Sequence, residues 1–313
     1  MIQNFALAEL TNALRRQAPE LRLEENALMA GYTTLRLGGP ADLMAHPSTP
    51  EQLLLLLTEA KRLNVPVTLI GHGSNLLVRD GGIRGLVIRV CREMREIRVD
   101  GNVLRAQSGA MMSAVAMAAA EHSLGGLTFA SGIPGTIGGG VYMNAGAYGG
   151  ELCQVVKRVE GYEMDGTPFS YTGDEMNFSH RYSRLMDENK VVTYVTCQLH
   201  SAKREELLAE MVELNRRRAD KQPLTLPSAG STFKRPAGGY ASAMVDQCGL
   251  KGLTIGGAQV SEKHAGFLVN RGGTAADFLA LMAEVQRVVH ERFGVMLEPE
   301  VRILGEDSLV HRV

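Results

Sequence analysis

Hydrophobic residues recur along the chain at two spacings, and the two spacings alternate from segment to segment. Leucines at helical intervals over residues 7–14 predict a first helix. Short apolar runs rich in β-forming residues at 43–45 and 68–70 flank a helical pattern at 50–63. This order of strand, helix and strand predicts a β-α-β unit in the first part of the chain.

The helical pattern at 50–63 has its own start signals. Thr49 is expected to be the N-cap, Pro50 suits the first helical position, and Gln52 is expected to complete a capping box with Thr49. Before the first strand, residues 31–40 are expected to be extended.

The middle of the chain alternates with the period of two that is typical of antiparallel strands. Runs at 97–99 and 103–105 flank an Asp-Gly-Asn turn. A second hairpin is predicted to turn at Asp165-Gly166, and a good strand pattern follows at 191–196.

Between these hairpins, an Ala- and Met-rich pattern over 111–122 predicts a helix. We expect its methionines (Met111, Met112, Met117) to fill the core and Gly125 to cap its end.

Helical patterns at 203–218, 240–247 and 274–293 dominate the last third, with a strand pattern at 267–269. Glycines are expected to stop the last two of these helices (Gly249, Gly294).

Composition limits the class of protein. A chain of 313 residues with 45% hydrophobic and 21% charged residues suits two or three packed lobes, which we expect at 1–85, 86–202 and 203–313. The net charge of −1 argues against nucleic-acid binding, and no apolar run approaches the ~20 residues of a membrane span. Glu9 within the first helical pattern argues against a signal peptide.

The four cysteines lie far apart and show neither metal-ligand spacing nor a disulfide framework (Cys91, Cys153, Cys197, Cys248). We therefore expect a reduced, cytoplasmic protein with buried thiols and no metal site.

A first glycine cluster, Gly71-His72-Gly73-Ser74-Asn75, follows the strand at 68–70, and the extended pattern resumes at 87–90. Glycine can take positive φ and lets a ligand approach the main chain. Successive N–H groups, with the side chains of Ser74 and Asn75, can bind an anion such as a diphosphate.

Taken alone, this cluster is also compatible with an ordinary tight turn. It is not a Rossmann fingerprint, because Leu76 stands where a third glycine is needed, and the chain has no Walker motif. A phosphate would therefore be held between strands, without a helix dipole.

A second glycine cluster runs from 130 to 150. Its glycine content argues against a helix or strand and suits a chain that lies flat against a large planar ligand.

Together with two later blocks, the two clusters resemble the UDP-N-acetylenolpyruvoylglucosamine reductase family. The five blocks occur in the family's order and cover nearly the whole chain. They are Gly-His-Gly-Ser-Asn-Leu-Leu-Val-Arg-Asp (71–80), Ser-Gly-Ile-Pro-Gly-Thr-Ile-Gly-Gly (131–139), Asn-Ala-Gly-Ala-Tyr-Gly (144–149), Ala-Gly-Ser-Thr-Phe-Lys (229–234) and Leu-Glu-Pro-Glu-Val-Arg (297–302).

The resemblance implies an α+β fold in which two subdomains of the vanillyl-alcohol-oxidase (PCMH) type hold FAD and a C-terminal α+β lobe binds substrate. It implies NADPH-dependent reduction of UDP-N-acetylglucosamine enolpyruvate to UDP-N-acetylmuramate in peptidoglycan precursor synthesis. FAD would be bound non-covalently and NADPH would be a co-substrate. We expect a monomer that binds neither nucleic acid nor membrane.

The resemblance places the FAD diphosphate on the first glycine cluster, and the flavin and its ribityl chain on the second. The implied cofactor contacts are Ile70, Gly71, Gly73, Ser74, Asn75, Leu76, Ser131, Gly132, Pro134, Gly135, Thr136, Gly138, Gly139, Asn144 and Gly146.

Three catalytic positions carry over from the family's motifs: Ser231 as the general acid, Arg181, and Glu300. His180 and Arg235 depart from the family's usual tyrosine and asparagine. The implied substrate contacts are Tyr148, Lys234, Gln259, Lys263 and His264.

The short stretch from Arg181 to Ser231 resembles the shorter of the family's two types, which lacks a tyrosine-bearing loop over the nucleotide. Residues 259–264 are the candidate for closing the site instead.

These residue types suit the implied chemistry. Hydride addition to the enolpyruvyl group leaves an enolate beside a carboxylate, which Arg181 can bind bidentately. That intermediate is basic enough for a serine hydroxyl to protonate, and Glu300 is expected to share a proton with it or to orient a donor. Because no second dinucleotide motif is present, NADPH and substrate are expected to use one site in turn.

Two other functions remain open at this point. One is a different FAD-dependent oxidase or dehydrogenase of the same fold, acting on a hydroxy acid or sugar, for which His72 raises the question of a covalent flavin; we expect His72 to have no chemical role. The other is a nucleotide-binding module without catalysis, which would leave the three catalytic positions unexplained.

Overall fold

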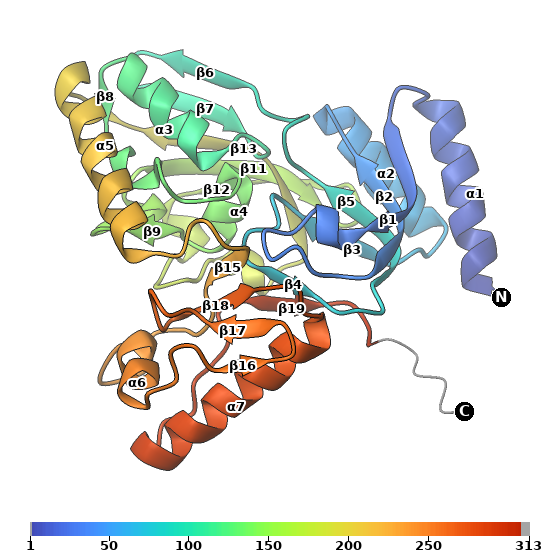
Figure 1. Cartoon of the computed structure of the whole chain (residues 1–313). Helices are drawn as coiled ribbons and strands as arrows, with labels where there is room; N and C mark the ends of the chain where they lie inside the picture. The colour runs from blue at the N-terminus through green and yellow to red at the C-terminus, as the bar shows by residue number, and fades with distance from the viewer. Residues whose placement is uncertain (1, 308–313) are drawn as a thin grey trace, which may run out of the picture. The chain divides into compact units, whose positions relative to one another are not determined.

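The computed structural model describes residues 2–307, and its elements are drawn in Figure 1. The chain divides into two compact units, each assembled from three separate segments. Unit 1 consists of Met1–Glu24, Leu43–His72 and Gly85–Arg217; unit 2 consists of Glu25–Asp42, Gly73–Arg84 and Arg218–Val313. The division into lobes at 1–85, 86–202 and 203–313 stays a prediction.

Two hydrophobic cores lie in unit 1 and one lies in unit 2. The first core of unit 1 joins α1 (Ile2–Gln17) and α2 (Pro50–Arg62) to buried residues of two strands of one sheet. These strands belong to a sheet of order β1-β2-β5-β3. The strand bounds are β1 Arg22–Leu28, β2 Pro40–His46, β3 Val67–Ile70 and β5 Ile83–Arg89. Strands β3 and β5 are parallel. The predicted strand, helix and strand correspond to β2, α2 and β3, and both strands lie in this sheet, on either side of β5.

The second core of unit 1 lies against a five-stranded sheet of order β12-β11-β13-β7-β6. All of its neighbouring strands are antiparallel, which confirms both predicted hairpins. The bounds are β6 Ile97–Asp100, β7 Val103–Gln107, β11 Val156–Glu163, β12 Pro168–Thr172 and β13 Lys190–Gln198. Three helices contribute to this core, namely α3 (Met112–Glu121), α4 (Ile137–Tyr142) and α5 (Arg204–Lys221).

Two short strand pairs complete unit 1, and 3-10 turns join its elements. The pairs are β8 (Leu124–Gly125) with β14 (His200–Ser201), and β9 (Gly146–Ala147) with β10 (Gly150–Glu151). The 3-10 turns are η2 Thr128–Ala130, η3 Leu152–Gln154, η4 Asp174–Met176 and η5 Arg184–Met186; η1 (Met29–Gly31) belongs to unit 2.

Unit 2 is built on a four-stranded antiparallel sheet of order β15-β18-β17-β16, and α7 packs along it (Figure 1). The bounds are β15 Ser228–Ser231, β16 Thr254–Ile255, β17 Ala258–Val260, β18 Phe267–Asn270, α6 Ala241–Gln247 and α7 Ala275–Phe293. The long helix starts and ends where its sequence predicts, with Thr274 as N-cap and Gly294 in the left-handed conformation at its end.

A second, parallel pair in unit 2 joins β4 (Leu76–Val78) to β19 (Arg302–Leu304). Because β4 directly follows the first glycine cluster, this cluster is flanked by strands on both sides, as predicted.

The second glycine cluster does contain a helix, so the prediction that excluded one is wrong. Helix α4 includes Gly138, Gly139 and Gly140. A Cβ atom on Gly138 would lie 2.7 Å from the Cβ of Ser108, and one on Gly140 would lie 2.8 Å from the sulfur of Met112. Close packing against these neighbours therefore requires glycine and outweighs its low helix propensity.

Two predicted caps also differ from the structure. Ser123, with φ of +58°, takes the left-handed position after α3, whereas Gly125 pairs in a strand. The side chain of Gln52 accepts a hydrogen bond from the N–H of Ser48 at 2.8 Å instead of bonding the N–H of Thr49. Thr49 itself is the N-cap, as predicted.

Two predictions of burial are wrong. Met117 is exposed, because it lies on the outer face of α3, whereas Met112 is buried on the inner face with valine and alanine side chains. All four cysteines are free, but only Cys91 and Cys197 are buried, and Cys153 is exposed.

Candidate active site

The first glycine cluster begins where β3 ends at the buried Ile70. Gly73 takes a φ of +79°, and a Cβ atom there would lie 2.1 Å from the carbonyl oxygen of Tyr32, so the loop requires glycine. Leu76 then begins β4. The loop thus exposes main chain between two strands, as an anion-binding turn requires.

Thr34 fixes this loop from the side, a role that the sequence did not indicate. Its N–H donates to the carbonyl of Gly73 at 3.1 Å, and its hydroxyl donates to the carbonyl of Ser228 at 2.6 Å. Thr34 therefore joins the glycine loop to the strand that ends at Ser231.

In unit 1, Gly71 meets the second glycine cluster. A Cβ atom on Gly71 would lie 2.7 Å from the hydroxyl oxygen of Thr136. The same hydroxyl is the N-cap of α4, where it accepts from the N–H of Gly139 at 3.3 Å. Gly138 is buried, whereas Gly139 is exposed. The absence of a side chain at Gly71 thus lets two predicted cofactor segments approach.

The segment before α4 contains the other predicted contacts of this cluster. Ser131 follows the η2 turn, and its hydroxyl accepts from the side chain of Asn215 at 3.4 Å. Gly132 and Pro134 lie at least partly open to solvent, and the buried Gly135 takes a φ of +133°.

Asn144 holds the second part of this cluster together from a fully buried position. Its side-chain N–H₂ donates to the carbonyl of Ser179 at 3.0 Å and to the carboxylate of Glu151 at 3.2 Å. Its side-chain oxygen accepts from the N–H of Cys153 at 3.0 Å. The carboxamide of Asn144 is therefore satisfied by protein, so its own ligand contact would come from the main chain, which has a φ of +42°.

Arg181 lies at the tip of a tight turn in which Ser179 and Tyr182 exchange two main-chain hydrogen bonds of 3.1 Å. It takes a φ of +55°, which is uncommon for a side chain of this size. Its guanidinium donates to the carbonyl of Gly146 at 3.1 Å. The structure thus brings a predicted catalytic residue to a predicted cofactor segment. The neighbouring His180 is exposed and lies 3.8 Å from Glu151.

Ser231 and Glu300 lie on adjacent segments of unit 2. The N–H of Glu300 donates to the carbonyl of Thr232, the residue after Ser231, at 2.8 Å. Asn75 of the glycine loop donates from its side chain to the carbonyl of Glu300 at 3.1 Å. Unit 2 thus joins the predicted acid, the predicted glutamate and a predicted cofactor contact. Arg181 belongs to unit 1, and its convergence with Ser231 and Glu300 stays a prediction.

The predicted substrate contacts are polar and mostly exposed. Lys234 lies 3.1 Å from Glu298, and the side-chain amide of Gln259 donates to the hydroxyl of Thr254 at 3.2 Å. In unit 1, Tyr148 is exposed with a φ of +54°.

The segment 259–264, expected to close the site, is held in place within unit 2. The buried Ser261 accepts hydrogen bonds from the N–H groups of Lys263 and His264, and the ammonium of Lys263 donates to the carbonyl of Ala219 at 2.6 Å. Burial lowers the pKa of His264, which favours a neutral imidazole.

These residues fit an FAD. The donor set consists of main-chain N–H groups and small polar side chains, which suits a diphosphate and a planar flavin. The close contacts at Gly71 and Gly73 leave no room for a Cβ atom, and the buried Nδ1 of His72 has no hydrogen-bond partner among the described residues. Within residues 2–307, no group of three His, Cys, Asp or Glu side chains could hold a metal ion, and no helix is long and apolar enough to cross a membrane.

Comparison with known families first defines the class. A model described as an FAD binding domain matches residues 41–170, so the chain contains an FAD-binding domain. A second model, described as the C-terminal domain of UDP-N-acetylenolpyruvoylglucosamine reductase, matches residues 222–304.

Whole-chain relatives then give the family. The chain is 46% identical to the UDP-N-acetylenolpyruvoylglucosamine reductase of Clostridium botulinum over 90% of its own length and 92% of the relative's. It is also 46% identical to that of Limosilactobacillus fermentum, over 93% of this chain and 97% of the relative. The chain belongs to the UDP-N-acetylenolpyruvoylglucosamine reductase family.

A solved structure shows the same fold. The enzyme of this name from Thermus caldophilus superposes with a TM-score of 0.78 at 35% identity, covering 91% of this chain and all of that one. The fold is thus the expected α+β one, in which an FAD-binding domain is followed along the chain by the family's C-terminal domain.

Proposed function

We propose that this protein reduces UDP-N-acetylglucosamine enolpyruvate to UDP-N-acetylmuramate with electrons from NADPH, using non-covalently bound FAD. The observation that carries the proposal is the joint presence of the glycine cradle, Ser231 beside Glu300, and Arg181 bonded to the second glycine cluster. The names of the relatives support the substrate, and the matched FAD binding domain supports the cofactor.

FAD would be held by the loop 71–76 and by the segments 131–139 and 144–146. When bound, it supplies hydride transfer from NADPH to the terminal carbon of the enolpyruvyl group. The protein's contribution is to orient the substrate and to control charge and protons.

Arg181 binds the negative charge that develops on the substrate. Once the terminal carbon has gained a hydride, the electron pair of the double bond resides on the carbon beside the carboxylate as an enolate. A guanidinium fixed by its bond to Gly146 can bind both oxygens of such a group.

Ser231 then donates its hydroxyl proton to that carbon, which completes the addition of one hydride and one proton across the double bond. General-acid transfer of this kind contributes roughly 10²–10⁴ in rate. Glu300 is anchored through its own main chain to Thr232 and Asn75, beside this serine. Its carboxyl group would share a proton with the enolate or orient the proton donor.

The setting follows from the same proposal. Such an enzyme would act as a monomer in the cytoplasm during peptidoglycan precursor synthesis, with the nucleotide sugar and NADPH as its partners and no role for nucleic acid or membrane.

An anaerobic spectroscopic titration tests the function. NADPH should bleach the flavin absorbance of the purified protein, and UDP-N-acetylglucosamine enolpyruvate should restore it with formation of UDP-N-acetylmuramate. Recovery only on admission of oxygen would contradict this substrate and favour an oxidase. A colourless protein that binds no added FAD would contradict the flavin chemistry altogether.

A further inference from the structure

Two arginines lie at the end of β5, the strand beside the first glycine cluster: Arg89 is its last residue, and Arg92 follows three residues later. Strand β5 runs parallel to β3, and Arg89 pairs with Ile70 at the ends of the two strands. The N–H of Val90 also donates to the carbonyl of Ile70 at 2.9 Å. Gly71 and His72 therefore leave the sheet next to Arg89, at the carboxyl ends of parallel strands, where ligands of open α/β sheets bind.

The charge around His72 is positive. Burial lowers the pKa of its imidazole, and the guanidinium groups of Arg89 and Arg92 lower it further. No carboxylate is among the groups that act on this imidazole. An anion that arrives beside His72 would therefore meet two cations and a ring that is neutral at pH 7.

The neutral imidazole has a preferred tautomer. Its Nδ1 atom is buried and has no hydrogen-bond partner among the described residues. A proton on Nδ1 would be a buried donor without an acceptor, which costs roughly 1–3 kcal/mol. The proton is therefore placed on Nε2, where the ring can donate to a ligand.

We propose that Arg89 and Arg92 supply the positive charge, and His72 an N–H donor, for the diphosphate of FAD at the carboxyl ends of β3 and β5. The inference rests on the proposed cofactor and extends its contacts beyond the glycine main chain. It departs from the expectation that His72 has no chemical role. Riboflavin has no diphosphate. These three side chains should therefore contribute to the binding of FAD and ADP but not to the binding of riboflavin.

Cofactor binding by the apoprotein tests the proposal without any assay of turnover. Dissociation constants for FAD and riboflavin are measured by quenching of flavin fluorescence, and ADP is measured as a competitor of FAD. Arg89→Gln and Arg92→Gln should each raise the dissociation constants of FAD and ADP by about tenfold or more, as expected for a lost charge-assisted hydrogen bond. The dissociation constant of riboflavin should stay unchanged. Added salt should reduce the difference in FAD affinity between the wild type and each arginine variant.

Matched variants separate charge from folding. Arg95 is an exposed arginine of the same segment, but it does not contribute to the lowered pKa of His72. Arg95→Gln should therefore leave the affinities for FAD, ADP and riboflavin unchanged. Arg89→Lys keeps the charge and should recover most of the affinity. His72→Gln keeps a donor near Nε2 and should bind FAD more tightly than His72→Phe. Thermal unfolding of each apoprotein identifies any variant that is misfolded.

Two results would overturn the inference. One is wild-type affinity for FAD and ADP in correctly folded Arg89→Gln and Arg92→Gln, and the other is an equal loss of riboflavin binding. Failure of the wild-type apoprotein to bind any flavin would instead overturn the proposed function itself.

Discussion

At the scale of single residues, one missing methyl group lets two loops meet. The hydroxyl of Thr136 occupies the space that a Cβ atom at position 71 would need, and this hydroxyl also caps α4. Gly71 therefore serves a packing role as well as its expected role in exposing main chain to a ligand.

Gly71→Ala should lower the stability of the apoprotein by roughly 1–3 kcal/mol, because overpacking forces buried neighbours to shift. Thr136→Ala removes the hydroxyl that would clash with the new Cβ atom. In a Thr136→Ala background, Gly71→Ala should therefore lower the stability by less. A double-mutant cycle on the thermal midpoints measures this coupling. Strictly additive effects would argue against a clash between the two side chains.

Ser231 can be tested through the two halves of the catalytic cycle. Ser231→Ala should keep flavin reduction by NADPH and slow reoxidation by the enolpyruvyl substrate about 10²-fold or more, because only the second half needs a proton donor. Stopped-flow absorbance of the flavin follows both halves. An equal decrease in the rates of flavin reduction and reoxidation would contradict the assignment of Ser231 as the general acid.

The candidate residues could be identified from local motifs, but their contacts could not. Arg181 donates to Gly146, and Asn75 donates to Glu300, across long stretches of sequence. Thr34 and the arginines near His72 carried no motif, because their positions depend on strand pairing and not on neighbouring residues.

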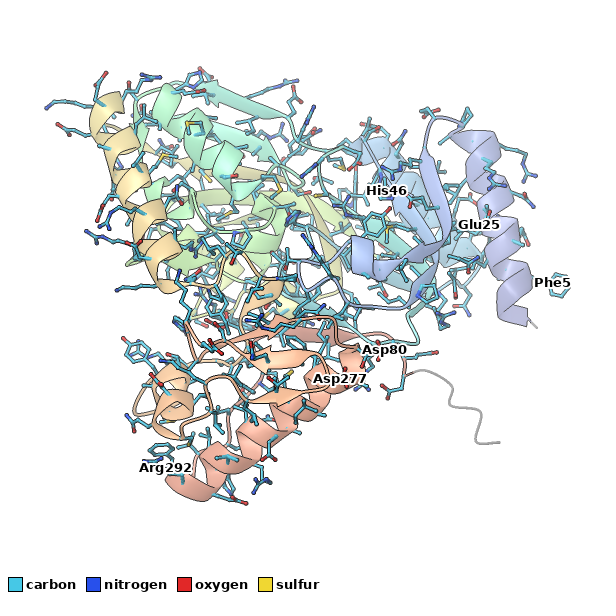
Figure 2. All side chains as sticks on the ribbon, in the orientation of Figure 1. Phe5, Glu25, His46, Asp80, Asp277 and Arg292 are labelled. Carbon is cyan, nitrogen blue, oxygen red and sulfur yellow. The ribbon has the colours of Figure 1, made fainter. Side chains whose placement is uncertain are left out.

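At the scale of elements, the N-terminus of α7 is capped both by residues at its own start and by Asp80 from a distant segment of the chain. Figure 2 shows Asp80 and Asp277 at this end of the helix. The two carboxylate oxygens of Asp80 accept from the N–H groups of Ala275 and Ala276, both at 2.9 Å. Thr274 and Asp277 form a capping box within the helix. The first donors of the helix are therefore satisfied.

Asp80→Ala should destabilise this end of α7 by about 1–2 kcal/mol, because a charged cap is lost. Hydrogen exchange of peptides that contain residues 275–278 should quicken, whereas exchange near the C-terminal end of the helix, around 290–293, should not. Unchanged exchange at 275 and 276 would contradict the capping role.

The turn between β11 and β12 carries a pH-sensitive carboxylate. Asp165 accepts from the main-chain N–H of Thr167 at 2.9 Å, and this bond, with smaller contributions from the Thr167 and Lys61 side chains, lowers the pKa of Asp165 to about 2. Since the pKa of Asp165 in the folded protein lies below its ordinary value of 3.8, its stabilising effect is present above pH 3.8 and is lost as the pH falls toward 2.

Asp165→Asn should therefore reduce stability at neutral pH, and the difference from wild type should close between about pH 4 and pH 2. Urea unfolding at a series of pH values measures the difference. If the difference in free energy of unfolding between wild type and Asp165→Asn is constant across this pH range, the charge of Asp165 does not contribute to stability.

Elements with their own start and stop signals were predictable, and elements that depend on distant partners were not. Helix α7 has both signals in its sequence. Strand β1 is polar and shows no clear alternation of buried and exposed positions, so no pattern indicated it. Helix α4 required knowledge of Ser108 and Met112, which pack against its glycines.

At the scale of the whole molecule, the family and the fold class were predictable because five motifs occur in a fixed order. The interleaving of the two units was not, because each unit takes three separate segments of the chain. Local patterns give the order of elements but not which of them share a core.

The kinetics should report whether one site serves both substrates in turn. Because the chain has no second dinucleotide motif, double-reciprocal plots for NADPH at several concentrations of the enolpyruvyl nucleotide should run parallel. Each substrate should also inhibit competitively against the other at high concentration. Intersecting lines, once substrate inhibition is excluded, would indicate two separate sites.

The pairing of β4 with β19 has a consequence for biosynthesis. Strand β4 leaves the glycine loop near the start of the chain, yet its partner is made only when translation reaches residues 302–304. On the ribosome, the second flank of the glycine loop stays unpaired until residues 302–304 have been synthesised. Cofactor capture should accordingly follow the synthesis of β19.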